Sequence, residues 1–311
     1  MMDTNQKIIL VTQRTRLEDL IRRYNTFGQA EFIISHNGGD FSDYRLEHET
    51  YRCAVQTALS ALQAFGRVQV LDRDLVPNYL FGKQDIVVAV GRDGLVANVL
   101  KYLPDGQPLI GVNPDPKRWD GQLLPFFPED LSKILPEVVR RARNTQSITL
   151  AQATLNDGQV LRAVNDLFIG RQTHASARYE ISQGAARESQ SSSGVIVSTG
   201  LGATGWLKSI LAGASGIARV FGVPDPIGPA HSFDRSASEL YYTVREPYPS
   251  ASTGADMVFG RITAKSPLQI VSNMPENGVI FSDGMEQDFL QFNSGSIVTI
   301  GIADQKGYLV T

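Results

Sequence analysis

Short apolar runs alternate with amphipathic stretches up to about residue 144. Four of the runs have the length and composition of buried strands: 7–12 (KIILVT), 67–72 (RVQVLD), 85–90 (DIVVAV) and 108–113 (PLIGVN). Apolar side chains at spacings of three and four over 46–65 predict an amphipathic helix that ends near Gly66, and a second helix is expected over 95–103. Strands that alternate with helices predict a parallel, doubly wound α/β domain.

The pattern changes near residue 145. The segment 128–143 is acidic at its start and ends on Arg140, Arg141 and Arg143, which favours a helix terminus over a phosphate site, and Pro136 is expected to kink or divide that helix. Strand-like pieces follow, with Asn156-Asp157-Gly158 as a hairpin signal. We expect an α/β domain over 1–144 and a mainly β domain over 145–311, with 205–213 helical and 222–236 a long loop.

Composition and charge narrow the functional classes. A length of 311 residues fits two domains, and a net charge of −3 with mixed signs argues against a general nucleic-acid partner. No apolar run approaches the length of a membrane span, which predicts no membrane partner, and the first residues show neither a signal nor a transit pattern. Cys53 is the single cysteine, lies in a helical pattern, and is expected to be a buried structural thiol of a cytoplasmic protein.

Histidine spacing gives no indication of a metal site within the protein. His36, His48, His174 and His231 lack ligand spacing with one another or with the cysteine. We therefore expect no protein-held metal, and surface or loop positions for the histidines.

The turn Gly91-Arg92-Asp93-Gly94 lies between a predicted central strand and a helix, where open α/β sheets bind ligands. Helix N-terminal amides favour phosphate there, and a carboxylate between glycines is accessible enough to accept a proton from a substrate hydroxyl. An ordinary helix cap by Asp93 is the alternative, and the motif by itself favours the cap.

Two further polar patterns occur in the second domain. Asn165 and Asp166 are adjacent in a strand-like apolar run, so one of them should be buried and need a partner; a structural bulge and a ribose-binding pair both fit. Gly200-x-Gly202-x-x-Gly205 has the form of a dinucleotide fingerprint, but no second strand ending in an acidic residue follows it. A glycine-rich turn lining another kind of nucleotide pocket is the better interpretation.

These three motifs occur in the order and approximate spacing of the NAD kinase family. The family's GGDG, GVN, NE, STPTGSTAY-like and DG motifs resemble, in that order, 91–94, 111–113, 165–166, 198–206 and 283–284. The mitochondrial-type branch is similar in further short pieces, namely 15–16 (TR), 168–182, 192–194 (SSG) and 245–247 (REP). The resemblance spans essentially the whole chain.

The resemblance implies an N-terminal doubly wound α/β domain and a C-terminal β-sandwich-like domain, with a nucleotide site between them, and a homodimer or larger homo-oligomer. As an alternative to the boundary at residue 144, the last ten or so residues return to the first domain. It implies transfer of the terminal phosphoryl group of ATP, with Mg²⁺, to the 2′-hydroxyl of the adenosine ribose of NAD. Asp93 would be the general base, and Gly91, Arg92 and Gly94 would face the donor phosphates. The NAD-binding residues would be Asn113, Asn165, Asp166, Ser193, Thr199, Thr204, Gly205 and Trp206.

The chain departs from the family pattern at several of these positions. Arg92 stands where the family has glycine and Leu95 where threonine is usual; the arginine adds bulk, although it could also supply a cation to phosphate. Trp206 replaces tyrosine, Asp166 replaces glutamate, and Ser193 stands where many bacterial members have aspartate. A catalytically impaired NAD or NADP sensor and a lipid-type kinase of the same superfamily are therefore alternatives to an active NAD kinase.

Overall fold

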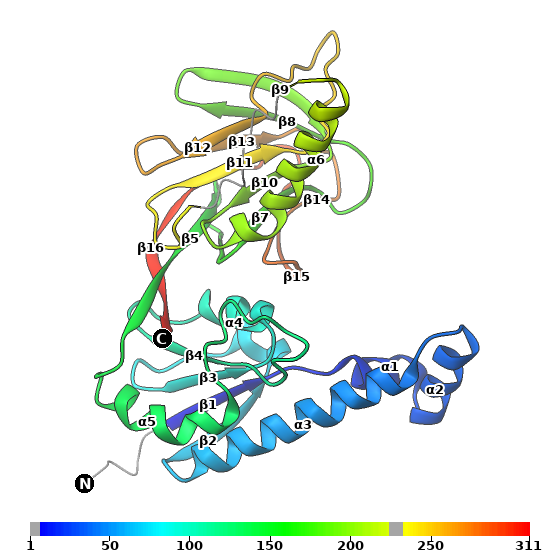
Figure 1. Cartoon of the computed structure of the whole chain (residues 1–311). Helices are drawn as coiled ribbons and strands as arrows, with labels where there is room; N and C mark the ends of the chain where they lie inside the picture. Colours follow the sequence, from blue (N-terminus) through cyan, green and yellow to red (C-terminus); the bar gives the residue numbers. More distant parts are fainter. Residues whose placement is uncertain (1–6, 224–232) are drawn as a thin grey trace. The chain divides into compact units, whose positions relative to one another are not determined.

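The computed structural model describes residues 7–223 and 233–311 and divides into two compact units (Figure 1). Unit one consists of Met1–Gln146 and Tyr308–Thr311, and unit two consists of Ser147–Gly307. Most of the segment expected to form a long loop, 222–236, lies outside the described residues, as do His231 and the first six residues.

The sheet of unit one is parallel, in the strand order β2-β1-β3-β4. Its strands coincide with the four predicted runs: β1 (Lys7–Thr12), β2 (Arg67–Asp72), β3 (Ile86–Val90) and β4 (Pro108–Val112). Every residue of β3 is buried, as a strand covered on both faces should be. The doubly wound α/β prediction is confirmed.

Helices cover both faces of this sheet (Figure 1). On one face, α3 (Phe41–Gln63) and α5 (Leu131–Val139) bury Tyr51, Leu62 and Ile134 against strand residues such as Val88. On the other face lies α4 (Asp93–Leu100), whose residues from Leu95 onward are all buried. Two 3-10 helices, η1 (Arg73–Asn78) and η2 (Pro128–Asp130), complete the connections.

The long helix α3 differs from its prediction in three respects. It begins at Phe41 rather than near residue 46, and its C-cap is Ala64 in a right-handed conformation, so the expected glycine cap at Gly66 is wrong. The expectation that Cys53 is buried is also wrong, because it lies on the exposed side of α3. Pro136 was expected to kink or divide the helix over 128–143, but α5 continues through it, so this expectation is wrong. The segment instead changes from the 3-10 helix η2 to the α-helix α5 at Leu131.

Two helices in the region before α3 were not predicted. α1 (Arg16–Tyr24) and α2 (Phe27–His36) form a helical pair that packs on the N-terminal part of α3 through Leu17, Ala30 and Phe41. Figure 1 shows this pair at the end of α3 that projects beyond the sheet. Thr15 and Thr26 cap the two helices, a signal that the sequence does contain.

Unit two contains two antiparallel sheets around one core. One sheet has the order β12-β11-β10-β7-β14-β15, and in the other β13 lies between β16 and β8, with β9 at the edge. Side chains of both sheets, among them Ile181, Val197 and Ile270, form the core between them, which confirms the β-sandwich-like prediction. A helix, α6 (Trp206–Val220), covers the outer face of the six-stranded sheet through Phe168 and Ile196.

The strands of unit two match most of the strand-like pieces of the sequence. Their bounds are β5 (Thr145–Leu155), β6 (Val160–Ala163), β7 (Asp166–Arg171), β8 (Ala177–Gln183), β9 (Ala186–Ser192), β10 (Val195–Ser198), β11 (Leu240–Val244), β12 (Phe259–Ile262), β13 (Leu268–Ser272), β14 (Gly278–Ser282), β15 (Met285–Gln291) and β16 (Ile297–Val310). The predicted hairpin joins β5 to β6, with Gly158 at φ 89°. The two strands not predicted, β9 and β15, are the most polar.

Strand β16 contributes to both units. The first part of β16 pairs antiparallel with β13, whereas Tyr308 and Leu309 near its end pair parallel with β4. The last residues of the chain are therefore part of unit one. No helix among the described residues is long and apolar enough to cross a membrane.

Candidate functional site

The GRDG turn begins at the carboxyl end of β3, and α4 starts within it. Arg92 is the N-cap of α4 and makes no side-chain capping bond, while Asp93 is the first helical residue. The interpretation of Asp93 as an ordinary cap is therefore wrong. A Cβ added at Gly91 would lie 2.7 Å from a methyl group of Leu95, whereas Gly94 is exposed and has open space around it.

The Asp93 carboxylate is held from the loop that follows β4. Its Oδ1 accepts a hydrogen bond of 2.6 Å from the backbone N–H of Leu123. That loop can approach because residue 111 is glycine: a Cβ there would collide with the carbonyl oxygen of Leu123. Gly111, the glycine of the GVN segment, thus allows the loop to come close enough to hold the Asp93 carboxylate.

Arg92 is also held in place. Its guanidinium lies 4.9 Å from the ring centroid of Trp119, within the range of a cation–π interaction. Arg73, the first residue of η1, adds a second positive charge: burial lowers the pKa of Arg73, and the charge of Arg92 contributes to the same direction. The two guanidiniums therefore follow β2 and β3, the strands on either side of β1, at the carboxyl edge of the sheet, an arrangement suited to an anion.

Asn113 directly follows β4 and is buried. Its side-chain amide donates to the carbonyl oxygen of Trp119, and its Oδ1 accepts from the backbone N–H of Asp115. Both interactions shape the loop that carries Trp119. The structure thus gives Asn113 a role in positioning this loop.

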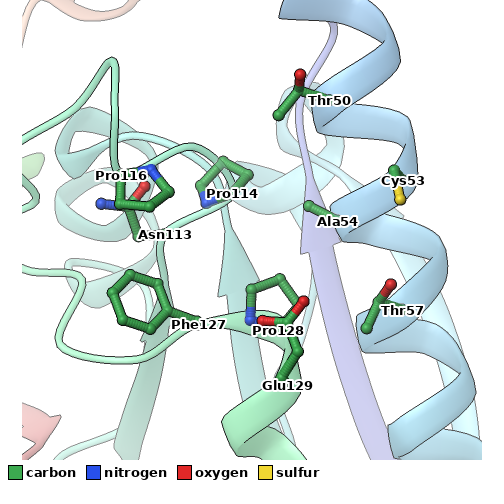
Figure 2. Close-up of a pocket in the computed structure, with 10 residues that line it drawn as sticks. All are labelled: Thr50, Cys53, Ala54, Thr57, Asn113, Pro114, Pro116, Phe127, Pro128 and Glu129. Carbon is green, nitrogen blue, oxygen red and sulfur yellow. The ribbon is translucent and has the colours of Figure 1, made fainter.

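A hollow of about 510 Å³ lies beside this loop, facing α3 (Figure 2). It is lined by Thr50, Cys53, Ala54, Thr57, Asn113, Pro114, Pro116, Phe127, Pro128 and Glu129. Neither Arg92 nor Asp93 lines it, so the hollow is separate from the GRDG turn.

In unit two, Asp283 organises the Asn165-Asp166 pair. Its carboxylate accepts hydrogen bonds from the backbone N–H groups of Val164, at 3.1 Å, and Asn165, at 2.6 Å, with a longer one of 3.4 Å from Asp166. Asp283 itself has φ 53°, the left-handed conformation that aspartate tolerates in turns. The DG motif therefore lies against the Asn165-Asp166 pair.

The glycine-rich loop joins the same group from the end of β10. The Thr199 hydroxyl donates to the carbonyl oxygen of Val164 at 2.6 Å, and its backbone N–H donates to the carbonyl oxygen of Asn165. A Cβ at Gly202 would collide with the carbonyl oxygen of Asn165 and lie 2.6 Å from Asp166 Oδ1. Glycine at this position lets the loop approach the polar pair, and the segment does not continue as a Rossmann unit.

Asp166 carries an incompletely satisfied carboxylate. Its Oδ1 is buried and has no hydrogen-bond partner among the described residues. Burial raises the pKa of Asp166 to about 7, the Ser198 hydroxyl opposes the shift, and the charge of Asp283 adds to it. A buried acceptor of this kind is costly unless a donor reaches it, so this carboxylate is suited to a ligand hydroxyl.

The remaining candidate residues are distributed differently. Thr204 and Gly205 are exposed at the start of α6, and the Thr204 hydroxyl donates back to the carbonyl oxygen of Leu201. The Trp206 ring stacks on Phe168, with ring centroids 6.1 Å apart. Ser193 precedes β10, at the opposite end of that strand from Thr199, and its backbone N–H donates to the carbonyl oxygen of Arg245. Ser193 therefore lies apart from Asp166, which pairs with Ser198 at the other end of β10, whereas Trp206 packs on a residue of the strand that Asp166 begins.

Three positioning contacts were not predicted from the sequence: Leu123 with Asp93, Trp119 with Arg92, and Asp283 with the backbone of Asn165. Asp283-Gly284 was recognised as a motif, and an aspartate before glycine is a recognisable turn signal. The other two depend on a loop whose path no local pattern specifies.

Known proteins with a similar sequence include NAD kinases. No protein-family model matches the chain. It is 27% identical to NAD kinase 2, mitochondrial, of Rattus norvegicus and 26% identical to that of Homo sapiens, each over 66% of this chain. The matched part spans about 60% of the length of these relatives.

Solved structures share the fold. An NAD kinase from Archaeoglobus fulgidus in complex with ATP aligns with a TM-score of 0.57 and 15% identity, over 98% of this chain and 93% of that one. Yeast NADH kinase complexed with NADH aligns with a TM-score of 0.58 and 14% identity, over 99% of this chain and 84% of that one. These likenesses show that the chain has the fold of these two proteins.

Proposed function

We propose that this chain, which belongs to the NAD kinase family, transfers the terminal phosphoryl group of ATP to the 2′-hydroxyl of the adenosine ribose of NAD. The observation that carries the proposal is the convergence of three motifs, far apart in the sequence, on Asp166 and its unpartnered Oδ1. A nucleotide ribose supplies the hydroxyl donors that such an acceptor requires.

Unit one contributes the donor side of the reaction in this proposal. Gly91, Arg92 and Gly94 face the phosphates, with the amide groups at the start of α4 and the Arg92 guanidinium as donors. Asp93 accepts the proton of the ribose hydroxyl as that oxygen attacks the terminal phosphorus and the bond to the departing ADP breaks. The hydrogen bond from Leu123 fixes one carboxylate oxygen and so orients the other.

Unit two contributes the NAD side. Asn165 and Asp166 hydrogen-bond the ribose hydroxyls, and Asp283 and Thr199 hold the backbone that carries this pair. Thr204 and Gly205, exposed at the start of α6, are available to line the nucleotide pocket. We propose that Asn113, Ser193 and Trp206 also contact NAD. The hydrogen bonds and the ring contact described for them above are made to other parts of the protein.

Mg²⁺ is proposed to accompany ATP. The described residues include no group of three His, Cys, Asp or Glu side chains that could hold a metal by themselves, so the oxygen ligands would come chiefly from the phosphates and water, which is how this cation is commonly bound. When bound, the ion neutralises charge on the phosphate oxygens. Asp93 lies next to the proposed phosphate loop and offers carboxylate oxygen of the type that Mg²⁺ prefers.

We also propose a cytoplasmic homodimer or larger homo-oligomer. The free thiol of Cys53 fits a reducing compartment, and the exposed apolar side chains Ile217, Val220 and Phe221 at the end of α6 are available for contact between copies. Light scattering of the purified chain tests the assembly, and a monomer at micromolar concentration would contradict it.

The activity is tested by incubating the purified chain with NAD, ATP and Mg²⁺ and assaying NADP. We expect NADP to accumulate, and to fail to accumulate when ATP or Mg²⁺ is omitted. Tight NAD binding without NADP formation would overturn the proposed kinase activity and would indicate a sensor.

A further inference from the structure

A small cavity in unit one has a concentration of positive charge that the proposed reaction does not use. Its volume is about 230 Å³, and its charged lining residues are Lys83, Arg141 and Arg143. The described residues that line it include no carboxylate. The two arginines belong to the basic cluster after α5, for which the sequence pattern favours a helix terminus over a phosphate site.

The cavity lies at the edge of the sheet opposite to the GRDG turn. Lys83 precedes β3 and Gly106 precedes β4, so both lie at the amino ends of strands, whereas the GRDG turn follows the carboxyl end of β3. The five residues of β3 span about 17 Å at the usual rise of about 3.3 Å per residue. An ion in this cavity would therefore be remote from the donor phosphates of the proposed reaction.

The end of α5 does not need these guanidiniums for its hydrogen bonds. The backbone N–H of Arg141 donates to the carbonyl oxygen of Val138, and that of Ala142 to the carbonyl oxygen of Glu137, each at 2.9 Å. These two bonds form a Schellman motif, which satisfies both carbonyl groups through the backbone alone. The arginine side chains are thus available to line the cavity.

Arg141 has an unusual backbone conformation for its residue type. Its φ is 54°, in the left-handed region where the residue after a helix is usually glycine or asparagine. An arginine in this conformation destabilises the fold relative to glycine. A strained position of this kind points to a function of the side chain, and here the side chain lines the cavity.

Arg143 is held by three groups. Its Nε donates to the backbone oxygen of Thr311 at 2.9 Å, its guanidinium lies 5.1 Å from the ring centroid of Phe126, and its Nη1 lies 2.8 Å from a carboxylate oxygen of Glu137. The Glu137 side chain is 51% exposed, so water screens this ion pair and it contributes little. Arg143 therefore presents a guanidinium that a ligand would not have to order.

A fixed turn carries Lys83. The buried side chain of Gln107 donates to the carbonyl oxygens of Gly82, at 3.0 Å, and Asp85, at 2.9 Å. The Asp85 carboxylate accepts from the backbone N–H of Gly82 and pairs with Lys7, so it is not directed at Lys83. Within the part of the chain that the structure describes, neither Lys83 nor Arg141 forms an ion pair. Both charges remain available to an anion.

We propose that this cavity binds a compact oxyanion with two or more negative charges, held by Lys83, Arg141 and Arg143. Its volume is below the roughly 300–1,000 Å³ typical of pockets for drug-sized ligands, so it fits a small ion rather than a whole nucleotide. Guanidinium and ammonium groups bind both phosphate and carboxylate, so a phosphoanion and a polycarboxylate satisfy the same chemistry. The proposal does not depend on the kinase activity.

Calorimetric titration of the full chain tests for this ion. The probes are pyrophosphate and tricarballylate, with acetate as the monovalent control, in a chloride buffer without Mg²⁺. We expect at least one multivalent ion to bind at least about tenfold more tightly than acetate, because each further hydrogen bond between charged groups contributes about one such factor.

The two multivalent probes distinguish the sources of the ion. Binding of pyrophosphate alone would indicate a phosphoanion, binding of tricarballylate alone a polycarboxylate, and binding of both a site for either kind. Binding of neither ion, or acetate binding of equal strength, would overturn the proposal.

Substitutions show whether the ion binds in this cavity. Lys83→Gln and Arg141→Gln should each weaken binding about tenfold, whereas Lys133→Gln, which removes an exposed lysine of α5 that does not line the cavity, should not. Arg92→Gly removes the cation proposed for the donor phosphates. Binding that survives both cavity substitutions but is lost in Arg92→Gly would place the ion at the donor site and overturn the cavity proposal, whatever the kinase assay gives.

Arg141→Gly separates loss of the ligand from loss of the fold. Glycine removes the guanidinium and also suits the left-handed backbone at the end of α5, so the midpoint of thermal unfolding should rise. Binding of the multivalent ion should nevertheless weaken about tenfold, as in Arg141→Gln. Unchanged binding in a folded Arg141→Gly variant would overturn the proposal.

Discussion

The Asp93 carboxylate and the backbone N–H of Leu123 are joined by a hydrogen bond of 2.6 Å. This bond crosses from the start of α4 to the loop after β4, and it exists because Gly111 permits the loop to pass close to the sheet. It holds one carboxylate oxygen and so restricts rotation of the side chain. The proposed general base is therefore oriented before any substrate binds.

Replacing Asp93 with asparagine should abolish turnover without loss of NAD affinity. The asparagine oxygen can still accept from Leu123, but the side chain cannot take a proton, so we expect kcat to fall by about 10²–10⁴-fold. Steady-state kinetics together with NAD calorimetry measure the two effects separately. Gly28→Ala, in α2 of the same unit, is the matched control for the fold, since a Cβ there meets nothing within 4 Å. Unchanged turnover in the asparagine variant would remove Asp93 from the mechanism.

Gly111→Ala should destabilise unit one. The added methyl group would collide with the Leu123 carbonyl, and overpacking of this kind costs about 1–3 kcal/mol. Denaturant unfolding followed by circular dichroism gives the free energy of unfolding. Gly301→Ala, at a position with open space, should change it far less. Equal stability of the two variants would mean that the loop moves without cost.

Gly202→Ala should weaken NAD binding. A methyl group there would press on the Asn165 carbonyl and on Asp166 Oδ1, so the polar pair would shift from its present position. A hydrogen bond to a charged group contributes about 1.5–3 kcal/mol, and about 1.4 kcal/mol corresponds to a tenfold change in affinity. We therefore expect KM for NAD to rise by about tenfold or more when these hydrogen bonds are misplaced. Gly213→Ala, within α6 and with no neighbouring atoms within 4 Å, should leave KM unchanged. A normal KM in Gly202→Ala would show that NAD does not depend on this contact.

Asp166 should make both stability and NAD affinity depend on pH. Burial raises the pKa of Asp166 from 3.8 to about 7, so between these values the folded chain retains a proton that the unfolded chain has lost. Its contribution to the free energy of unfolding therefore decreases as pH rises from about 4 to about 7 and is constant beyond. NAD affinity should change in the opposite direction, increasing from pH 6 to pH 8 as the carboxylate ionises and accepts ribose hydroxyls. Asp166→Asn should flatten both profiles relative to the parent chain, and profiles that stay parallel would contradict the assignment.

Arg92 is the residue by which the turn at 91–94 differs from the GGDG motif of the NAD kinase family. If its guanidinium binds the donor phosphates, Arg92→Gly should raise KM for ATP by about tenfold and leave KM for NAD unchanged, in line with the strength of a hydrogen bond between charged groups. Trp119→Leu, which removes the ring under the guanidinium, should have a smaller effect in the same direction. An increase in turnover in Arg92→Gly would instead show that the arginine obstructs the donor site.

Much of the fold could be predicted because periodicity reports burial directly. The run that forms β3 is apolar throughout and is buried throughout, and the Asn156-Asp157-Gly158 turn joins two strands as expected. The polar strand β9 escaped prediction because only some of its residues face the core, such as Gln190, which hydrogen-bonds Tyr179. A strand whose inward side chains are polar has no hydrophobic signature.

The candidate site was less accessible to prediction, since it depends on contacts between distant segments. Asp283 and Asn165 are separated by 118 positions and yet share a hydrogen bond of 2.6 Å. Family resemblance supplied the residues, but not the fact that Ser193 precedes β10, at the other end of that strand from Thr199, or that Trp206 stacks on Phe168. Local sequence indicates which residues carry chemistry, and tertiary packing decides which of them act together.

The division of β16 has a consequence for how the protein is made. Because Tyr308 and Leu309 pair with β4, the sheet of unit one lacks a strand until the ribosome has synthesised these two residues, long after β4 itself. Unit two is in effect an insertion between Gln146 and Tyr308, and it can complete its fold first while the earlier-made unit waits. A nascent chain arrested before residue 308 would thus expose the edge of β4, a surface prone to pair with another strand. Quality control during synthesis has a defined window in which to act: the interval between translation of β4 and translation of Tyr308 and Leu309.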